Sequence, residues 1–197
     1  METPIPADIF YDDLFAKWHT NGNLPHIESI RLHQIVTYRL ADSLPLEVAK
    51  RLIHETEDEP GNSVYRKRLE TFLDAGHGSC VLRCSEIAEI IRDAWLHDDG
   101  VRYHLRAWCI MPNHVHILFQ PIAPWTLATI VKTWKQYTAR RINPLIGSTG
   151  TFWQAEYWDR YIRDAKHYQS AFDYILQNPV KAGLADSVNG WPWSGPK

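Results

Sequence analysis

The feature that most constrains this chain is a pair of apolar, strand-like runs placed back to back near its middle. Residues 101–111 and 114–120 have strand composition, and Pro112-Asn113 forms the short turn that joins them. Strands joined this tightly run antiparallel. In the second run, alternate residues share a face of the sheet. One face carries Val115, Ile117 and Phe119, and the other carries His114, His116 and Leu118.

Segments with strand or helical periodicity surround this hairpin. Strands are predicted at 30–40 and at 152–163, which is rich in aromatics. Helical spacing recurs at 46–55, at 64–76, from Ser85 to Asp98, from Pro124 to about Ile142, and from Asp164 to about Asn178, where Pro179 disfavours continuation. The order strand, helix, strand, strand, helix, strand, helix predicts an α+β protein. Its helices pack against a ferredoxin-like antiparallel sheet.

The domain organisation follows from the same pattern. A length of 197 residues suits one domain with its own core. Residues 1–29 contain several prolines and glycines and are predicted to be irregular. The domain is predicted at 30–184, with a helical insertion at about 46–84, and residues 185–197 are predicted to form a C-terminal tail.

Composition excludes several classes of protein. No run approaches the roughly 18 apolar residues of a membrane span, and the acidic start lacks the basic region of a signal peptide. The three cysteines follow no disulfide or zinc pattern, which favours a reducing, cytoplasmic location. The formal charge of −2 is no general signature of nucleic-acid binding, so such binding would depend on local basic groups and on stacking by some of the nine tryptophans.

His114 and His116 lie on one face of the second strand, where they could bind one metal ion together. The spacing alone is weak, because ten histidines in this length produce roughly half of one such pair by chance. An ordinary structural role for both side chains therefore remains open.

The last predicted helix carries a second group of polar side chains. Tyr174 and Asn178 are four residues apart, so they lie one above the other beside the apolar stripe, and Lys181 would follow if the helix continued. Two imidazoles and one amide oxygen would leave a metal with open coordination positions, as catalytic sites require. Tyrosine would then be the natural nucleophile toward a phosphodiester. The alternative is an amphipathic helix edge, with Asn178 capping the helix end.

Five segments, in order, resemble one known family. They are IVTYRLADSLP at 35–45, AWCIMPNHVHILFQP at 107–121, WKQYTARRIN at 134–143, FWQAEYWDRYIRD at 152–164 and YILQNPVKAGL at 174–184. The chain resembles the REP-associated tyrosine transposases, within the single-tyrosine HUH endonuclease and transposase superfamily. WPW at 191–193 also resembles the end of these proteins. The resemblance covers about residues 30–193.

The resemblance implies a site and an activity. His114 and His116 match the metal-binding pair of the family, Asn178 matches the third ligand, and Tyr174 matches the nucleophile. The implied activity is metal-dependent cleavage and rejoining of single-stranded DNA near hairpins formed by palindromic repeats, through a covalent 5′-phosphotyrosine. Mg²⁺ or Mn²⁺ is the expected ion, and imidazole ligands favour Mn²⁺.

DNA contacts are expected from local polar groups, and each of them has an ordinary surface role as its alternative. The candidates are Lys132, Lys135, Arg140, Asp159, Arg160, Arg163 and Lys181. Self-association is a further expectation for which no residue is singled out. Two alternative functions stay open: a hydrolase that activates water on the metal, and a hairpin-binding module that no longer cuts.

Overall fold

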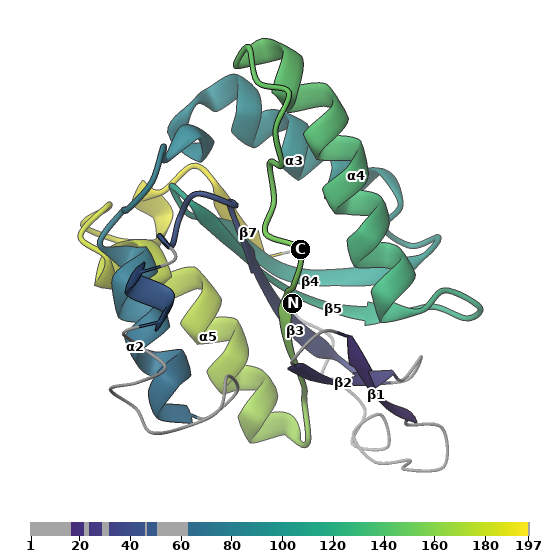
Figure 1. Ribbon diagram of the computed structural model, residues 1–197. Helices are drawn as coiled ribbons and strands as arrows, with labels where there is room; N and C mark the ends of the chain where they lie inside the picture. Colours follow the sequence, from purple (N-terminus) through teal and green to yellow (C-terminus); the bar gives the residue numbers. More distant parts are fainter. Residues whose placement is uncertain (1–16, 22–23, 29–31, 46, 51–62, 197) are drawn as a thin grey trace.

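A computed structural model describes residues 17–21, 24–28, 32–45, 47–50 and 63–196 (Figure 1). Its main sheet has five antiparallel strands in the order β6-β3-β5-β4-β7. They are β3 (Gln34–Arg39), β4 (Tyr103–Ile110), β5 (His114–Pro121), β6 (Trp158–Tyr161) and β7 (Ser194–Pro196). Within this sheet, β3, β4, β5 and β6 have the arrangement of a ferredoxin-like fold. The predicted fold class is therefore confirmed.

Helices cover both faces of this sheet. They are α2 (Ser63–Asp74), α3 (Ser85–His97), α4 (Leu127–Leu145) and α5 (Ala165–Lys181), with short 3₁₀ helices at Val81–Arg83 and Val188–Gly190. In Figure 1, α3 and α4 lie on one side of the sheet, and α2 and α5 lie on the other. The sheet thus separates the molecule into two helical layers, and each face of β5 meets a different layer.

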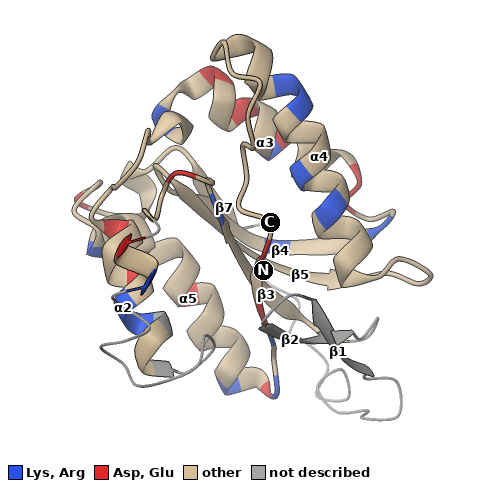
Figure 2. Cartoon of the chain, viewed as in Figure 1, with Lys and Arg blue, Asp and Glu red and all other residues tan. Residues whose placement is uncertain are grey.

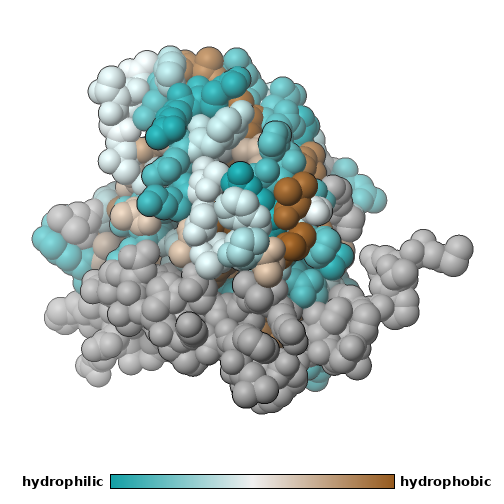
Figure 3. Space-filling view, turned by 90° about the vertical axis from the view of Figure 1, so that its right-hand side faces the viewer, coloured by the Kyte–Doolittle hydropathy of each residue, from teal (hydrophilic) through white to brown (hydrophobic). Residues whose placement is uncertain are grey.

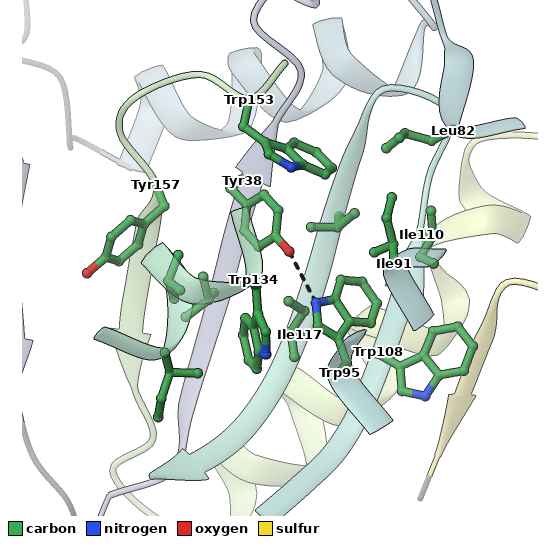
Figure 4. Packing of buried hydrophobic residues seen from close by; sticks show 14 of the residues in the cluster. Tyr38, Leu82, Ile91, Trp95, Trp108, Ile110, Ile117, Trp134, Trp153 and Tyr157 are labelled. Atoms are coloured by element: carbon green, nitrogen blue, oxygen red, sulfur yellow. Dashed lines mark hydrogen bonds between the residues drawn. The ribbon is translucent and has the colours of Figure 1, made fainter. Parts of the chain in front are cut away.

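The larger core lies beneath α3 and α4, as the period-2 alternation of the hairpin predicts. Val115, Ile117 and Phe119 belong to it. Figure 4 shows tryptophans from three elements in this core, where Trp95 Nε1 donates a hydrogen bond to the Tyr38 hydroxyl at 3.2 Å. Leu118 belongs instead to the smaller core beneath α5. His114 and His116, which share its face, therefore point toward the α2 and α5 layer.

The predicted end of the last helix at Asn178 is wrong, because α5 continues through Pro179 to Lys181. Proline removes only one N–H from the ladder. The chain recovers bonds just beyond it: Gly183, at φ +68°, donates to the carbonyl of Val180, and Leu184 donates to that of Pro179. This Schellman-type end stabilises the last turn and keeps Asn178 inside the helix.

Both ends of the chain differ from the prediction. Residues 1–29 were expected to be irregular, but β1 (Lys17–Asn21) and β2 (Leu24–Glu28) form an antiparallel pair, while the rest of that range lies outside the described residues. The two-residue sequence Gly22-Asn23 between them is typical of a hairpin. The predicted tail joins the sheet, because β7 pairs with β4. This pairing satisfies backbone groups that an open β4 edge would leave exposed.

Two predicted segments are shorter than expected or only partly described. The predicted strand at 152–163 is regular only at β6, because the carbonyls of Gln154 and Ala155 accept hydrogen bonds from the Lys135 ammonium of α4. Of the predicted helix at 46–55, residues 47–50 are helical, while 46 and 51–55 lie outside the described residues. In the described part of the chain, no helix is long and apolar enough to cross a membrane.

The face shown in Figure 3 is mostly hydrophilic where it is described, and its apolar residues form only small groups. In Figure 2, Lys and Arg positions recur along α4, which lies toward that face. The described part of this side therefore presents mainly charged and polar groups.

Candidate active site

The two histidines of β5 lie at the centre of the sheet, beneath the α2 and α5 layer. β3 and β4 flank β5 on both sides, and each histidine side chain is only 1 % exposed. Their Nε2 atoms are 3.0 Å apart. Two atoms bound side by side to an octahedral ion at about 2.1 Å lie about 3 Å apart, so this separation suits a shared cation.

Asn113 determines which nitrogen of His114 carries the proton. Its side-chain nitrogen donates to the backbone carbonyls of Leu73 at 3.1 Å and His77 at 2.8 Å. The amide oxygen must therefore face His114, whose Nδ1 is 2.7 Å away. Because that oxygen only accepts, Nδ1 of His114 carries the proton and donates it. Nε2 of His114 is left with a free lone pair, as a metal ligand requires.

His116 is oriented by the neighbouring strand. Thr37, which is its partner in the β3–β5 register, places Oγ1 2.8 Å from Nδ1 of His116. A threonine hydroxyl can donate or accept. When it accepts, Nε2 of His116 is also free to bind a cation, and when it donates, Nε2–H can bond to His114 instead.

Burial keeps both imidazoles neutral. It lowers the pKa of His114 well below the usual 6.5, and the neighbouring His116 lowers it further. Burial also lowers the pKa of His116 to about 3. Metal-binding histidines are neutral, so the electrostatics of this pocket suit ligation.

α5 brings three predicted residues to the histidines. The Tyr174 ring meets the His116 ring edge-on, with centroids 5.3 Å apart. Lys181 Nζ lies 5.4 Å from the centre of the Tyr174 ring. Asn178 is only 2 % exposed. Its side-chain nitrogen makes no well-aligned hydrogen bond to any described residue, although it is near enough to the Tyr174 hydroxyl to lower the pKa of that group.

The residues fit a divalent ion, and the protein would supply three ligands. Two imidazoles with converging Nε2 atoms, next to a buried amide whose oxygen can act as a ligand, form a reasonable cation site. Among the described residues, no three His, Cys, Asp or Glu side chains cluster tightly enough to hold a metal by themselves. Asn178 as the third ligand stays a prediction, and a site with three protein ligands would keep coordination positions open.

α2 contributes two carboxylates that the sequence analysis missed. Glu70 lies near enough to the Tyr174 hydroxyl to raise the pKa of that group. One turn later, Asp74 places Oδ1 3.7 Å from Nε2 of His114. Their four-residue spacing puts both on one helix face. That signal is present in the sequence, but only tertiary packing shows that this face meets the site.

The carboxylates and the tyrosine affect one another's ionisation. Burial raises the pKa of Tyr174, and the negative charge of Glu70 raises it further. Burial and Glu70 likewise raise the pKa of Asp74 to about 6, while Lys181 opposes this shift. A cation bound beside Tyr174 would favour its phenolate and offset these effects.

The predicted DNA contacts fall into three places, and their role in binding stays a prediction. Lys132, Lys135 and Arg140 lie on α4, across the sheet from the histidines. Lys135 is held by two backbone carbonyls, and burial lowers its pKa to about 8.

The remaining candidates lie on or near β6 and α5. Arg160, opposite Ile35 in the register, shares the face of β3 that carries Thr37, whereas Asp159 pairs with Val36 on the opposite face. Near the start of α5, burial lowers the pKa of His167, and the charges of Arg160 and Arg163 lower it further. Tyr174 is about 15 Å further along the helix from Asp164. Of the seven candidates, Lys181 lies beside Tyr174.

Comparison with known proteins finds similarity in the region that contains the candidate active site. Residues 84–178, which include the histidine pair, Tyr174 and Asn178, match the family described as "Transposase IS200 like". A REP-associated tyrosine transposase of Escherichia coli K12 is 29% identical over 96 residues, which are 47% of this chain and 53% of that protein. Over these residues the chain is similar to the REP-associated tyrosine transposases.

Further relatives show the same similarity. A relative from Haemophilus influenzae, assigned to the same group, is 33% identical over 98 residues, covering 45% of this chain and 56% of that protein. The chain thus matches about half the length of these curated relatives. A solved REP-associated tyrosine transposase bound to a REP hairpin matches in fold, with a TM-score of 0.55 at 21% identity. That match covers 83% of this chain and 75% of the solved one.

Proposed function

We propose that this chain is a metal-dependent endonuclease and strand transferase for single-stranded DNA, with Tyr174 as its nucleophile. The observation that carries this proposal is the packing of the Tyr174 ring against His116. His116 belongs to a buried, neutral pair with His114, and the Nε2 atoms of the two histidines are 3.0 Å apart. The similarity of residues 84–178 to transposases supports it, because transposases cut and join DNA. A tyrosine and a cation site on facing elements suit attack on a phosphodiester.

The chemical step uses residues from three elements. The Tyr174 oxygen attacks phosphorus and bonds to it, while the bond from phosphorus to the 3′ oxygen breaks. Glu70, which lies near the hydroxyl, takes the tyrosine proton. The departing 3′ oxygen takes a proton from solvent and leaves as a hydroxyl. Rejoining is the reverse reaction, in which a 3′-hydroxyl attacks the phosphotyrosine and Glu70 returns its proton to Tyr174.

His114, His116 and Asn178 would hold Mg²⁺ or Mn²⁺ in this proposal, and the ion would polarise a non-bridging phosphate oxygen. The Lys181 ammonium lies beside the tyrosine ring, where it can balance negative charge on the phosphate or the phenolate. The hydrogen bonds that His114 donates to Asn113 and His116 donates to Thr37 would keep both imidazoles in position.

The proposed substrate is single-stranded DNA next to a hairpin formed by a palindromic repeat. The solved relative bound to a REP hairpin supports this choice. Lys132 and Arg140 on α4 and Arg163 just before α5 are exposed, so they are proposed to contact the DNA backbone.

A labelled hairpin oligonucleotide with single-stranded flanks tests the proposal. We expect a Mn²⁺-dependent covalent adduct that survives denaturing electrophoresis, and we expect Tyr174→Phe to abolish it. Tyr137→Phe is the matched control, because Tyr137 is 48 % exposed on α4, across the sheet. An adduct that persists in Tyr174→Phe overturns the assignment. Cleavage without an adduct would favour the water-activating hydrolase, and binding without any product would favour the hairpin-binding module.

A further inference from the structure

A small cavity lies between α2 and the β3–β6 side of the sheet, next to the histidine pair. Its volume is about 110 Å³, and its walls include Thr37, Arg39, Tyr65, Glu156 and Trp158. We propose that this cavity binds one unpaired base of the DNA substrate, and this inference rests on the proposed function. Fixing that base would determine which phosphate of the strand reaches Tyr174.

The cavity is continuous with the candidate active site. Thr37 lines the cavity, and its hydroxyl oxygen is 2.8 Å from Nδ1 of His116. Leu73 also lines the cavity, and its backbone carbonyl accepts a hydrogen bond from Asn113, which orients His114. A group bound here would therefore lie beside the residues that position both imidazoles.

The size of the cavity selects among possible occupants. Pockets that enclose a whole drug-sized ligand span about 300–1,000 Å³, so this cavity suits a single ring system. A nucleotide could place its base inside and leave its sugar and phosphate outside, near the histidines. The half-exposed side chains around the cavity leave such an entrance open.

The lining combines aromatic faces with hydrogen-bonding groups, as base-binding pockets do. Tyr65 comes from α2, and Trp158 comes from β6, opposite Thr37 in the register. Arg39 is held at the wall by hydrogen bonds to Ser43 Oγ at 3.2 Å and the Leu40 carbonyl at 3.5 Å. Gln154 and Glu156 add acceptors on the same side.

This arrangement gives the helical insertion a role. The apolar floor of the cavity comes from Leu69 and Leu73, which follow Tyr65 at intervals of one helical turn. The same helix supplies Glu70 and Asp74 to the active site. α2 would therefore contact the base through Tyr65, Leu69 and Leu73, and contact the active site through Glu70 and Asp74.

A double-mutant experiment on binding tests the proposal. The Tyr174→Phe protein is titrated with a fluorescent hairpin oligonucleotide in which each flanking base is removed in turn. At one position, loss of the base should weaken binding about tenfold, because stacking on an aromatic side chain is worth about that factor. In the double variant Tyr174→Phe with Trp158→Ala, removal of the same base should weaken binding less than about twofold, because the Trp158 ring that stacks on the base is already absent.

The controls separate this proposal from folding defects and from the proposed chemistry. Trp125→Ala is the matched variant, because Trp125 packs against Arg102 at the start of α4 and should keep the tenfold loss. Tyr65→Ala, at a half-buried position, repeats the test without touching β6. Equal losses in all variants, no sensitive position or no measurable binding overturns the base pocket. Failure of adduct formation would overturn only the proposed reaction, because this readout is equilibrium binding.

Discussion

Replacing Asn113 with alanine probes the link between the fold and the proposed metal site. Asn113 is fully buried, donates to the carbonyls of Leu73 and His77, and accepts from Nδ1 of His114. Each hydrogen bond contributes about 1 kcal/mol, so the variant should lose about 3 kcal/mol of unfolding free energy. The carbonyl of Leu73 keeps a bond from the N–H of Gly76, which limits the penalty for an unpaired group.

The same substitution should weaken cation binding. Without the amide oxygen, Nδ1 of His114 no longer has its acceptor, so the proton can move to Nε2 and block the ligand position. Loss of such an orienting partner typically costs about 10- to 100-fold in metal affinity. Urea unfolding measures the stability, and the electron paramagnetic resonance signal of free Mn²⁺ measures the affinity.

Asn143→Ala is the matched control for this experiment. Asn143 lies on α4, and its side-chain nitrogen donates one hydrogen bond, to the carbonyl of Gly150 at 2.9 Å. This control should cost about 1 kcal/mol and leave Mn²⁺ affinity unchanged. If both variants lost the same stability and bound Mn²⁺ equally well, the assignment of the His114 proton would be refuted.

Three further predictions concern pH, charge and packing. Burial lowers the pKa of His33 to about 4 and that of His116 to about 3, so the unfolded chain takes up their protons first below pH 6.5. Urea unfolding should show full stability above pH 6.5. As the pH falls toward 4, the unfolding free energy should drop by up to about 1.4 kcal/mol per pH unit for each histidine. An unchanged slope of unfolding free energy against pH in His33→Gln would contradict this. Lys135→Met should lose about 2 kcal/mol of unfolding free energy, because the Lys135 ammonium donates to two carbonyls. The control Lys132→Met, at an exposed position, should leave stability unchanged. Equal melting temperatures of the two variants would contradict this. Trp95→Ala should cost about 3–5 kcal/mol in urea unfolding, because the side chain is fully buried, and a loss below about 1 kcal/mol would contradict the packing.

Features that depend on local backbone geometry could be predicted from the sequence. The two-residue period of a strand placed His114 and His116 on one face, and the structure keeps them there with Leu118. The helical period placed Tyr174 and Asn178 on one flank of α5. The order of strands and helices indicated the ferredoxin-like sheet, because few arrangements satisfy that order around an antiparallel hairpin.

Other features depend on groups that meet only after folding. Pro179 opposes helix continuation locally, yet the capping bonds beyond it stabilise the last turn and bring Lys181 to Tyr174. The final residues resemble a tail in sequence, but the open edge of β4 provides hydrogen-bonding partners for β7. Propensity scales describe a residue and its neighbours, so neither outcome is contained in them.

The sequence by itself therefore determined the order of elements and the residues that share a face within each one, because strand and helix periods act over a few residues. Only the tertiary structure decided which faces meet. Glu70 and Asp74 reach the site because α2 packs over the histidine face, about 40 residues before β5 in the chain. The proton on His114 is likewise set by carbonyls of Leu73 and His77, which reach Asn113 through long-range packing.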